Sequence, residues 1–214
     1  MNIPIPAQLA ALARQFADAG AVLYGVGGMI RSPLLGKPVS DYDTASALRP
    51  ERVQELCRAW GIRCVDTGAR FGTVTLLLED NFKTEHTTFR SDVYALGGVH
   101  QPQEVRFSES LETDARRRDF TVNAMYVDLL TGAILDPTGG LHDLAARRIR
   151  ATTEDPGLIL RDDGLRILRM ARFAALLAFS VDPATQAAAA EYAAGLRGIS
   201  AERVRDELYR LMAA

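Results

Sequence analysis

The chain has 214 residues, enough for one large domain or two small ones. A hydrophobic content of 48% and a charged content of 24% are typical of a globular protein, and the net charge of −2 excludes a uniformly basic nucleic-acid binder. The apolar runs are too short to span a bilayer, and the N-terminus lacks a signal-peptide pattern. With only two cysteines, Cys57 and Cys64, in no metal-binding spacing, we expect a cytoplasmic protein without a membrane partner.

Helices and strands alternate in the first part of the chain. Apolar residues at helical spacing predict a helix over 6–19, which Ala19-Gly20 ends. The apolar run 21–26 predicts a buried strand that leads into Gly27-Gly28 and a short helix. The next predicted elements are a strand at 41–45, a helix at 50–60, and strands at 62–66, 73–78 and 83–89. This order indicates a mixed α/β domain.

The second part of the chain is mainly helical. Glycines and a proline within 91–104 predict a loop, which is followed by a helix at 108–117 and strands at 123–129 and 133–135. Beyond the turn residues 136–140, only 148–151 has strand character. We therefore place a domain boundary after residue 138, with a mixed α/β domain at 1–138 and an all-helical domain at 139–214. Within the second domain, three helices are predicted to begin after Asp155, Asp182 and Ser200.

Two carboxylates two residues apart suggest a metal site. If Asp41 to Thr44 are extended, Asp41 and Asp43 point to the same side of the strand, with Cα atoms roughly 6.5–7 Å apart. Such a pair repels unless a cation lies between the carboxylates, and Mg²⁺ prefers carboxylate and phosphate oxygens. Glu85 adds a third carboxylate if its strand pairs next to that of Asp43; otherwise it faces solvent.

The glycine pair and a later helix suggest a nucleotide. Gly27 and Gly28, followed by Arg31 one helical turn later, are typical of an anion site, although a glycine pair often marks only a tight turn. Four charged residues then recur every three positions along one predicted helix: Asp163, Arg166, Arg169 and Arg172. They form either a charged edge with ion pairs or a polar template for the edge of a nucleobase. The excess of arginine favours the template.

Five segments together resemble the class II CCA-adding enzyme and bacterial poly(A) polymerase family, within the DNA-polymerase-β-like nucleotidyltransferases. The resemblance covers nearly the whole chain, and the segments occur in the family's order and spacing. They are Val26-Gly27-Gly28-Met29-Ile30-Arg31 with Asp41-Tyr42-Asp43; Arg117-Arg118-Asp119-Phe120-Thr121-Val122-Asn123-Ala124; Asp136-Pro137 with Gly139-Gly140; Asp162-Asp163-Gly164-Leu165-Arg166-Ile167-Leu168-Arg169; and Ile199-Ser200-Ala201-Glu202-Arg203 with Glu207-Leu208.

The resemblance implies a nucleotidyltransferase head with a small mixed sheet, followed by an all-α neck. It implies that an RNA 3′-hydroxyl attacks the α-phosphate of CTP or ATP, with Mg²⁺ as cofactor and the tRNA 3′ acceptor end as partner. The implied metal ligands are Asp41 and Asp43, and the implied catalytic residues are these two with Glu85 as the third carboxylate. The implied nucleotide contacts are Gly27, Gly28, Arg31, Arg118, Asp119 and Asn123, with Asp163 and Arg166 for the base and Arg169 and Arg172 for phosphates.

Some positions depart from the family pattern. Ser32, Asp162 and Gly164 stand where the family usually has Asp, Glu and Pro, and the loop after Asp92 lacks the usual acidic residue and arginine pair. That loop assists the switch from C to A addition, so a CC-adding specialist remains an alternative, as do a poly(A) polymerase and a catalytically silent RNA-binding module. We also expect that the family's body and tail domains are missing from this chain.

Overall fold

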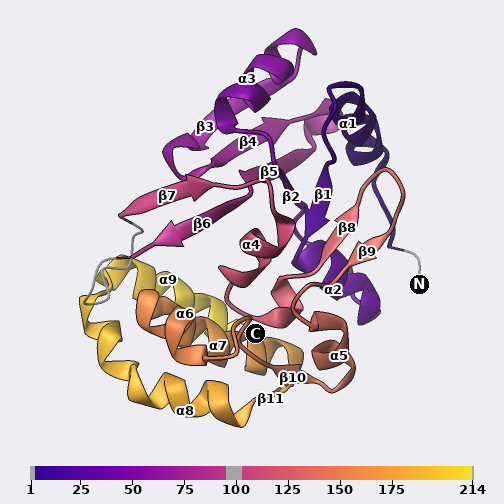
Figure 1. Cartoon of the computed structure of the whole chain (residues 1–214). Helices are drawn as coiled ribbons and strands as arrows, with labels where there is room; N and C mark the ends of the chain where they lie inside the picture. The colour runs from indigo at the N-terminus through magenta and orange to yellow at the C-terminus, as the bar shows by residue number, and fades with distance from the viewer. Residues whose placement is uncertain (1–2, 95–102, 214) are drawn as a thin grey trace. The chain divides into compact units, whose positions relative to one another are not determined.

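The computed structural model describes residues 3–94 and 103–213 (Figure 1). The chain forms two compact units that alternate along the sequence. Unit 1 comprises Met1–Ser91, Val105–Asp114 and Met125–Pro137, and unit 2 comprises Asp92–Glu104, Ala115–Ala124 and Thr138–Ala214. The division into a catalytic domain at 1–138 and a base-reading domain at 139–214 stays a prediction.

Unit 1 is built on a mixed β-sheet. Among the described residues, seven strands form this sheet in the order β3-β4-β5-β2-β1-β8-β9. Neighbouring strands are antiparallel except β2 and β5, which run parallel. The strands are β1 (Tyr24–Val26), β2 (Asp43–Ser46), β3 (Arg63–Gly68), β4 (Thr73–Leu77), β5 (Lys83–Thr88), β8 (Tyr126–Asp128) and β9 (Ile134–Leu135).

Helices of unit 1 lie on both faces of this sheet. The helices that begin in unit 1 are α1 (Ala7–Asp18), α2 (Gly28–Leu34), α3 (Pro50–Ala59) and α4 (Leu111–Arg116), and the chain leaves unit 1 within α4. Helix α1 buries the four apolar residues that the helical spacing predicted, Leu9, Leu12, Ala13 and Phe16. The ring centroid of Phe16 lies 5.6 Å from that of Trp60 and 5.5 Å from that of His86. Helix α1 therefore packs on the face of the sheet toward which His86 points.

Most predicted elements of unit 1 are present, but three predictions need correction. Strand β2 begins at Asp43, so Asp41 precedes the strand. Strand β8 begins at Tyr126, because Thr121–Asn123 forms a 3₁₀ turn, η3. The predicted loop at 91–104 is wrong at its ends, where β6 (Arg90–Val93) pairs with β7 (Glu104–Phe107). Pairing across the loop supplies hydrogen bonds that neither short strand has alone. The rest of that loop, 95–102, lies outside the described residues.

Unit 2 is mainly helical, as predicted. Its helices are α5 (Gly140–Ala145), α6 (Pro156–Asp162), α7 (Leu165–Leu177), α8 (Pro183–Glu191) and α9 (Ala201–Met212). The three predicted helix caps are confirmed. The side chain of Asp155 accepts a hydrogen bond from the N–H of Gly157 (2.9 Å), that of Asp182 from Thr185 (3.1 Å), and that of Ser200 from Arg203 (3.4 Å).

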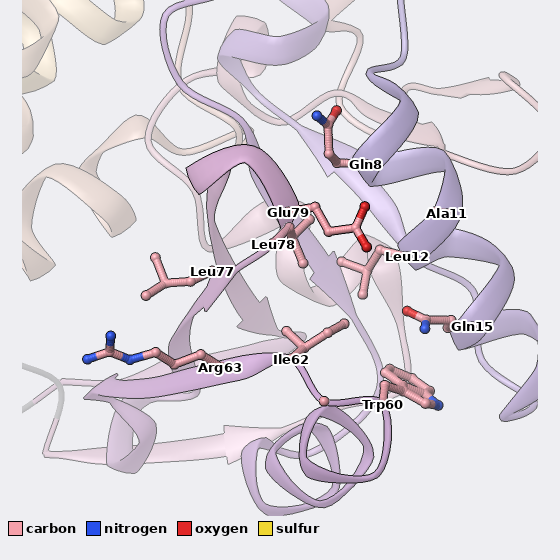
Figure 2. Close-up of a pocket in the computed structure, with 11 residues that line it drawn as sticks. Gln8, Ala11, Leu12, Gln15, Trp60, Ile62, Arg63, Leu77, Leu78 and Glu79 are labelled. Atoms are coloured by element: carbon pink, nitrogen blue, oxygen red, sulfur yellow. The ribbon is translucent and has the colours of Figure 1, made fainter.

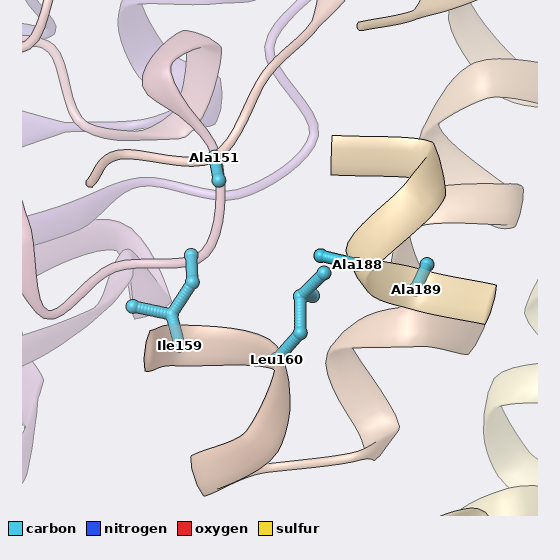
Figure 3. Packing of buried hydrophobic residues seen from close by; sticks show 5 residues of the cluster. All are labelled: Ala151, Ile159, Leu160, Ala188 and Ala189. Atoms are coloured by element: carbon cyan, nitrogen blue, oxygen red, sulfur yellow. The ribbon is translucent and has the colours of Figure 1, made fainter. Parts of the chain in front are cut away.

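Small residues let the helices of unit 2 pack closely. In Figure 3, Leu160 of α6 points toward Ala188 and Ala189 of α8, with Ile159 and Ala151 beside it. Partly buried Ile167, Met170 and Tyr192 pack against this cluster. Unit 2 also contains a two-stranded parallel sheet of β10 (Arg148–Ile149) and β11 (Ser180–Val181). The sequence indicated β10, within 148–151, but not β11.

Two remaining expectations concern the chain as a whole. No helix within residues 3–94 and 103–213 is long and apolar enough to cross a membrane. Cys57 is buried and Cys64 is partly buried, and both are free thiols.

Candidate active site

The acidic residues of unit 1 meet across the parallel strand pair. In the register of β2 and β5, Asp43 lies directly opposite Glu85. Adjacent strands are about 4.8 Å apart, and paired residues of a parallel pair point to the same face. Both side chains are exposed, while the neighbouring Thr44 and His86 are buried. The sequence predicted Glu85 as a third carboxylate only if its strand pairs next to that of Asp43. The two strands do pair in this way.

Asp41 lies close to this pair in sequence but precedes the strand. Its side chain is exposed, and its carboxylate accepts a hydrogen bond of 2.9 Å from the Ser40 hydroxyl. Among the described residues, no three His, Cys, Asp or Glu side chains lie close enough together to hold a metal ion. The structure therefore brings Asp43 and Glu85 together, and it leaves Asp41 beside them without forming a closed three-carboxylate cluster.

The donor set fits a divalent metal ion. Two exposed carboxylates held opposite each other repel, and a hard cation with oxygen ligands relieves that repulsion. A cation of this kind usually takes only one or two protein carboxylates and completes its shell with water and substrate phosphates. Asp43 and Glu85, with Asp41, are the residues of unit 1 that would hold such an ion.

The glycine pair lies between β1 and α2. Gly27 adopts φ +61° and ψ −112°, a conformation open to glycine and strained for other residues, and its N–H donates to the Met125 carbonyl (3.1 Å). A Cβ on Gly28 would lie 3.7 Å from a guanidinium nitrogen of Arg31. The structure thus brings the arginine over the second glycine. A nucleotide contact for Gly27, Gly28 and Arg31 stays a prediction.

A cavity of about 390 Å³ in unit 1 is separate from these residues. It lies between α1 and the ends of β3 and β4, and Figure 2 shows Leu12 and Gln15 of α1 facing Trp60 and Ile62. None of the predicted site residues lines it. The candidate metal site therefore consists of exposed residues of β2 and β5 and is not this cavity.

In unit 2, Asp119 is the centre of a buried polar cluster. Its Oδ1 accepts hydrogen bonds from the Phe120 N–H (2.8 Å) and from Asn123 Nδ2 (3.0 Å). Its Oδ2 accepts from two nitrogens of Arg169, at 2.8 and 2.6 Å. Burial raises the pKa of Asp119, but the guanidinium of Arg169 and the hydrogen bond from Asn123 outweigh burial and lower the pKa to about 2. Asp119 is therefore an anion at neutral pH. Arg118, the other nucleotide contact predicted in this segment, is partly buried.

The predicted base-reading pair is present, but not on one helix. Asp163 follows the end of α6 in an extended conformation (φ −138°, ψ 100°), and α7 begins only at Leu165. Its Oδ1 accepts from the Leu165 N–H (3.0 Å) and its Oδ2 from Arg203 (3.2 Å). The prediction that Asp163 shares a helix with the arginines is therefore wrong, because its side chain bonds the free N–H at the start of α7 instead of continuing the helix.

Arg166 is buried, although its spacing predicted a place on a charged edge. Only 9% of its surface is exposed. Its guanidinium donates to two backbone carbonyls, those of Ile159 (3.2 Å) and Arg117 (2.8 Å). Both carbonyls are neutral acceptors, so these bonds orient the guanidinium without neutralising its charge. Arg166 thus stays a positively charged donor beside Asp163.

The two later arginines of α7 pair with carboxylates from elsewhere in unit 2. Arg169 pairs with Asp119, and Arg172 forms an ion pair with Glu207 of α9. Both guanidinium groups also lie over the ring of Phe173, with the carbon of Arg172 at 4.2 Å and that of Arg169 at 5.3 Å from its centroid. Each of these two arginines thus pairs with a carboxylate from outside α7.

The sequence alone did not indicate these partners. Glu207 and Arg203 belong to a segment that resembled a family motif, but nothing in its spacing identified Arg172 and Asp163 as their partners. The same holds for Asp119 and Arg169, which are 50 residues apart. The only local sign of an ion pair at Asp119 is that this carboxylate follows a run of arginines. Such a pattern is common on exposed surfaces, so it does not identify Arg169 as the partner.

Comparison with known proteins identifies the family. Residues 23–150 match the poly A polymerase head domain family, and residues 178–214 match the family described as the probable RNA and SrmB-binding site of polymerase A. The chain belongs to the poly A polymerase head domain family. Nucleotidyltransferases of this family are generally metal-dependent.

Among the similar curated relatives and solved structures are CCA-adding enzymes. The chain is 38% identical over 205 residues to the CCA-adding enzyme of Enterococcus faecalis, covering 96% of this chain and 48% of the relative. It is 40% identical over 195 residues to that of Levilactobacillus brevis, covering 91% and 47%. A crystal structure of the Bacillus stearothermophilus CCA-adding enzyme with CTP superimposes with a TM-score of 0.85 at 34% identity, covering 95% of this chain and 47% of that one. The chain thus spans about half the length of the relatives it matches.

Proposed function

We propose that this chain is the catalytic and base-reading part of a CCA-adding tRNA nucleotidyltransferase. It transfers C and A from CTP and ATP to the 3′ end of tRNA and releases pyrophosphate. The observation that carries the proposal is the parallel register that sets the exposed Asp43 opposite the exposed Glu85, in a chain that belongs to this family. Acting on tRNA, the protein would work in the cytoplasm.

Unit 1 performs the transfer in this proposal. Asp41, Asp43 and Glu85 would hold Mg²⁺, and the bound ion would lower the pKa of the attacking RNA hydroxyl and balance the charge of the phosphates. Arg31 binds the triphosphate next to Gly28, whose missing side chain leaves room for phosphate oxygens near the backbone. Transfer needs no side-chain nucleophile, because the RNA hydroxyl attacks the α-phosphate directly.

Unit 2 selects the nucleotide in this proposal. Asp163 offers acceptors and Arg166 offers donors, and together they can match the edge of cytosine or adenine. Arg118, Asp119 and Asn123 contact the ribose. Arg169 and Arg172 contact phosphates, and each would then share its guanidinium with its present carboxylate partner, Asp119 or Glu207.

Incubation with a tRNA that ends before CCA, Mg²⁺ and each triphosphate singly and together tests the function. The proposal expects two C residues with CTP alone and a full CCA end with both triphosphates. Two C residues and no A with both would identify a CC-adding specialist. Runs of A with ATP alone would identify a poly(A) polymerase, and no incorporation at saturating tRNA would support a silent binding module.

Substitution of the acidic residues tests the metal assignment. Asp41→Ala and Asp43→Ala should each lower the rate of incorporation on the order of 10³-fold, because the developing charge on the phosphate loses its counter-ion. Both residues are exposed, so the free energy of unfolding should change by less than about 0.5 kcal/mol. Glu55→Ala removes an exposed carboxylate of α3 and serves as the control. Incorporation at the wild-type rate by Asp43→Ala would rule out this site.

A further inference from the structure

A line of buried polar side chains runs along the junction of β2 and β5. It consists of Thr44 and Ser46 from β2 and Thr84, His86 and Thr88 from β5, which we call the polar seam. Each of the five is at most 1% exposed. Buried hydroxyl and imidazole groups are costly unless they are hydrogen-bonded, so the polar seam requires an explanation that apolar packing does not need.

One end of the polar seam holds the backbone of the acidic segment. The hydroxyl of Thr84 donates to the carbonyl of Tyr42 at 2.6 Å, and Tyr42 lies between Asp41 and Asp43. The hydroxyl of Thr44 lies 3.3 Å from both Thr84 Oγ1 and the carbonyl of Glu85. These bonds therefore hold the main chain between Asp41 and Asp43 and that of Glu85 from the buried side of the sheet.

His86 bridges the two strands at the centre of the polar seam. Its Nδ1 lies 3.2 Å from Thr44 Oγ1, and its Nε2 lies 3.1 Å from Ser46 Oγ. The ring is fully buried, and a neutral imidazole has one N–H donor and one acceptor nitrogen. A hydroxyl can donate or accept, so the two hydroxyls of β2 satisfy both nitrogens.

These bonds oppose the repulsion between the carboxylates. Like charges directly opposite each other destabilise a strand pair. A shift of one residue in the register of β2 and β5 would relieve the repulsion between Asp43 and Glu85. It would also carry the seam residues to the other face and break their hydrogen bonds. A buried polar network that is satisfied in a single arrangement excludes the slipped register.

We propose that the polar seam positions the divalent-cation ligands, with Thr84 and His86 as positioning residues that keep Asp43 opposite Glu85. The inference rests on the proposed function, because it takes Asp41, Asp43 and Glu85 as the ligands. Neither Thr84 nor His86 touches the ion, since both side chains point to the opposite face from the carboxylates. Their loss should weaken cation binding through the backbone.

Titration of the whole chain with Mn²⁺ alone, followed calorimetrically, tests this inference. Thr84→Val keeps the size of the side chain and removes the bond to the Tyr42 carbonyl, and His86→Leu removes both bridges to β2. Each should weaken Mn²⁺ binding by about tenfold. The matched control is Thr88→Val, which removes a buried bond of 2.7 Å to the Leu48 carbonyl at the other end of the polar seam. It should lower stability and leave Mn²⁺ affinity unchanged.

A kinetic measurement separates positioning from a general loss of structure. In Thr84→Val, the Mg²⁺ concentration for half-maximal incorporation should rise about tenfold, while kcat at saturating Mg²⁺ stays near the wild-type value. His86→Gln keeps a donor and an acceptor that reach toward Ser46, so it should recover part of the affinity lost in His86→Leu. If His86→Leu does not fold, Thr84→Val and His86→Gln still decide the matter.

The outcomes distinguish this inference from the function on which it rests. Wild-type Mn²⁺ affinity in both Thr84→Val and His86→Leu would overturn the inference, as would an equal loss in Thr88→Val. If Asp43→Ala abolishes Mn²⁺ binding while the seam variants bind normally, only the positioning role fails. If Asp43→Ala binds Mn²⁺ as the wild type does, the metal assignment and the inference both fail.

Discussion

Asp119 illustrates how unit 2 keeps a buried charge. Only 6% of the residue is exposed, and burial alone would favour the neutral acid. Three donors surround the carboxylate: the Phe120 N–H, the Asn123 amide and the Arg169 guanidinium. Removal of one partner from such a pair leaves the other charge buried, which costs more than the pair itself contributes.

The stability of the protein should depend on Asp119 at low pH. The pKa of this carboxyl is about 2 in the folded protein against 3.8 in a free chain, so its stabilisation is complete well above pH 3.8 and disappears as the pH falls toward 2. The difference in unfolding free energy between wild type and Asp119→Asn, from urea unfolding, should therefore shrink by roughly 2 kcal/mol between pH 5 and pH 2. A difference that does not vary with pH would show that Asp119 is not held as an anion.

At the scale of elements, the break between α6 and α7 decides where the base-reading residues lie. Gly164 occupies this break, at a position where the family usually has proline. A Cβ on Gly164 would lie 3.0 Å from the backbone carbon of Gly195, in the 3₁₀ segment η4 (Ala193–Gly198). This is closer than a side-chain carbon normally approaches backbone, so glycine lets η4 pack against the start of α7.

Replacement of Gly164 should therefore disturb this packing. Gly164→Ala should lower the free energy of unfolding by about 1–2 kcal/mol, because η4 must shift to admit the methyl group. Gly195→Ala is the matched control, since a Cβ there meets nothing within 4 Å and should change stability by less than about 0.5 kcal/mol. Urea unfolding measures both. Equal losses in the two variants would indicate that close packing is not the reason for glycine at 164.

At the scale of the molecule, the predicted chemistry divides between the two units. The carboxylates Asp41, Asp43 and Glu85 and the glycine pair belong to unit 1, whereas the polar groups of Asp119, Asp163 and Arg166 belong to unit 2. The residues of unit 1 are suited to any nucleoside triphosphate, because all nucleoside triphosphates carry the same phosphates. The polar groups of unit 2 offer donors and acceptors that differ between bases. Metal binding and base selection should therefore respond to different substitutions.

Asp163→Ala should change selectivity more than rate. Loss of its acceptors should reduce the preference between CTP and ATP by about tenfold, since one hydrogen-bonding partner of the base is removed. Mn²⁺ binding should stay at the wild-type level. The measurement is kcat/KM for each triphosphate, with Asp206→Ala, an exposed carboxylate of α9, as the control. A large loss of rate with unchanged selectivity would assign Asp163 a structural role.

The sequence by itself determined most of the local structure. The apolar spacing of α1 and the caps at Asp155, Asp182 and Ser200 were sufficient to predict these helices. Helix periodicity and capping depend on residues within one or two turns, so they can be recognised without knowledge of the fold. Five short segments in the family's order and spacing were together enough to indicate the family.

Only the tertiary structure decided how distant residues meet. It set Asp43 opposite Glu85, paired Arg169 with Asp119, and buried His86 between two hydroxyls of β2. It also added β11, and it moved Asp163 off the helix of the arginines. Strand register and ion pairs between residues 35 to 50 positions apart depend on the packing of whole elements, and no local pattern records that packing.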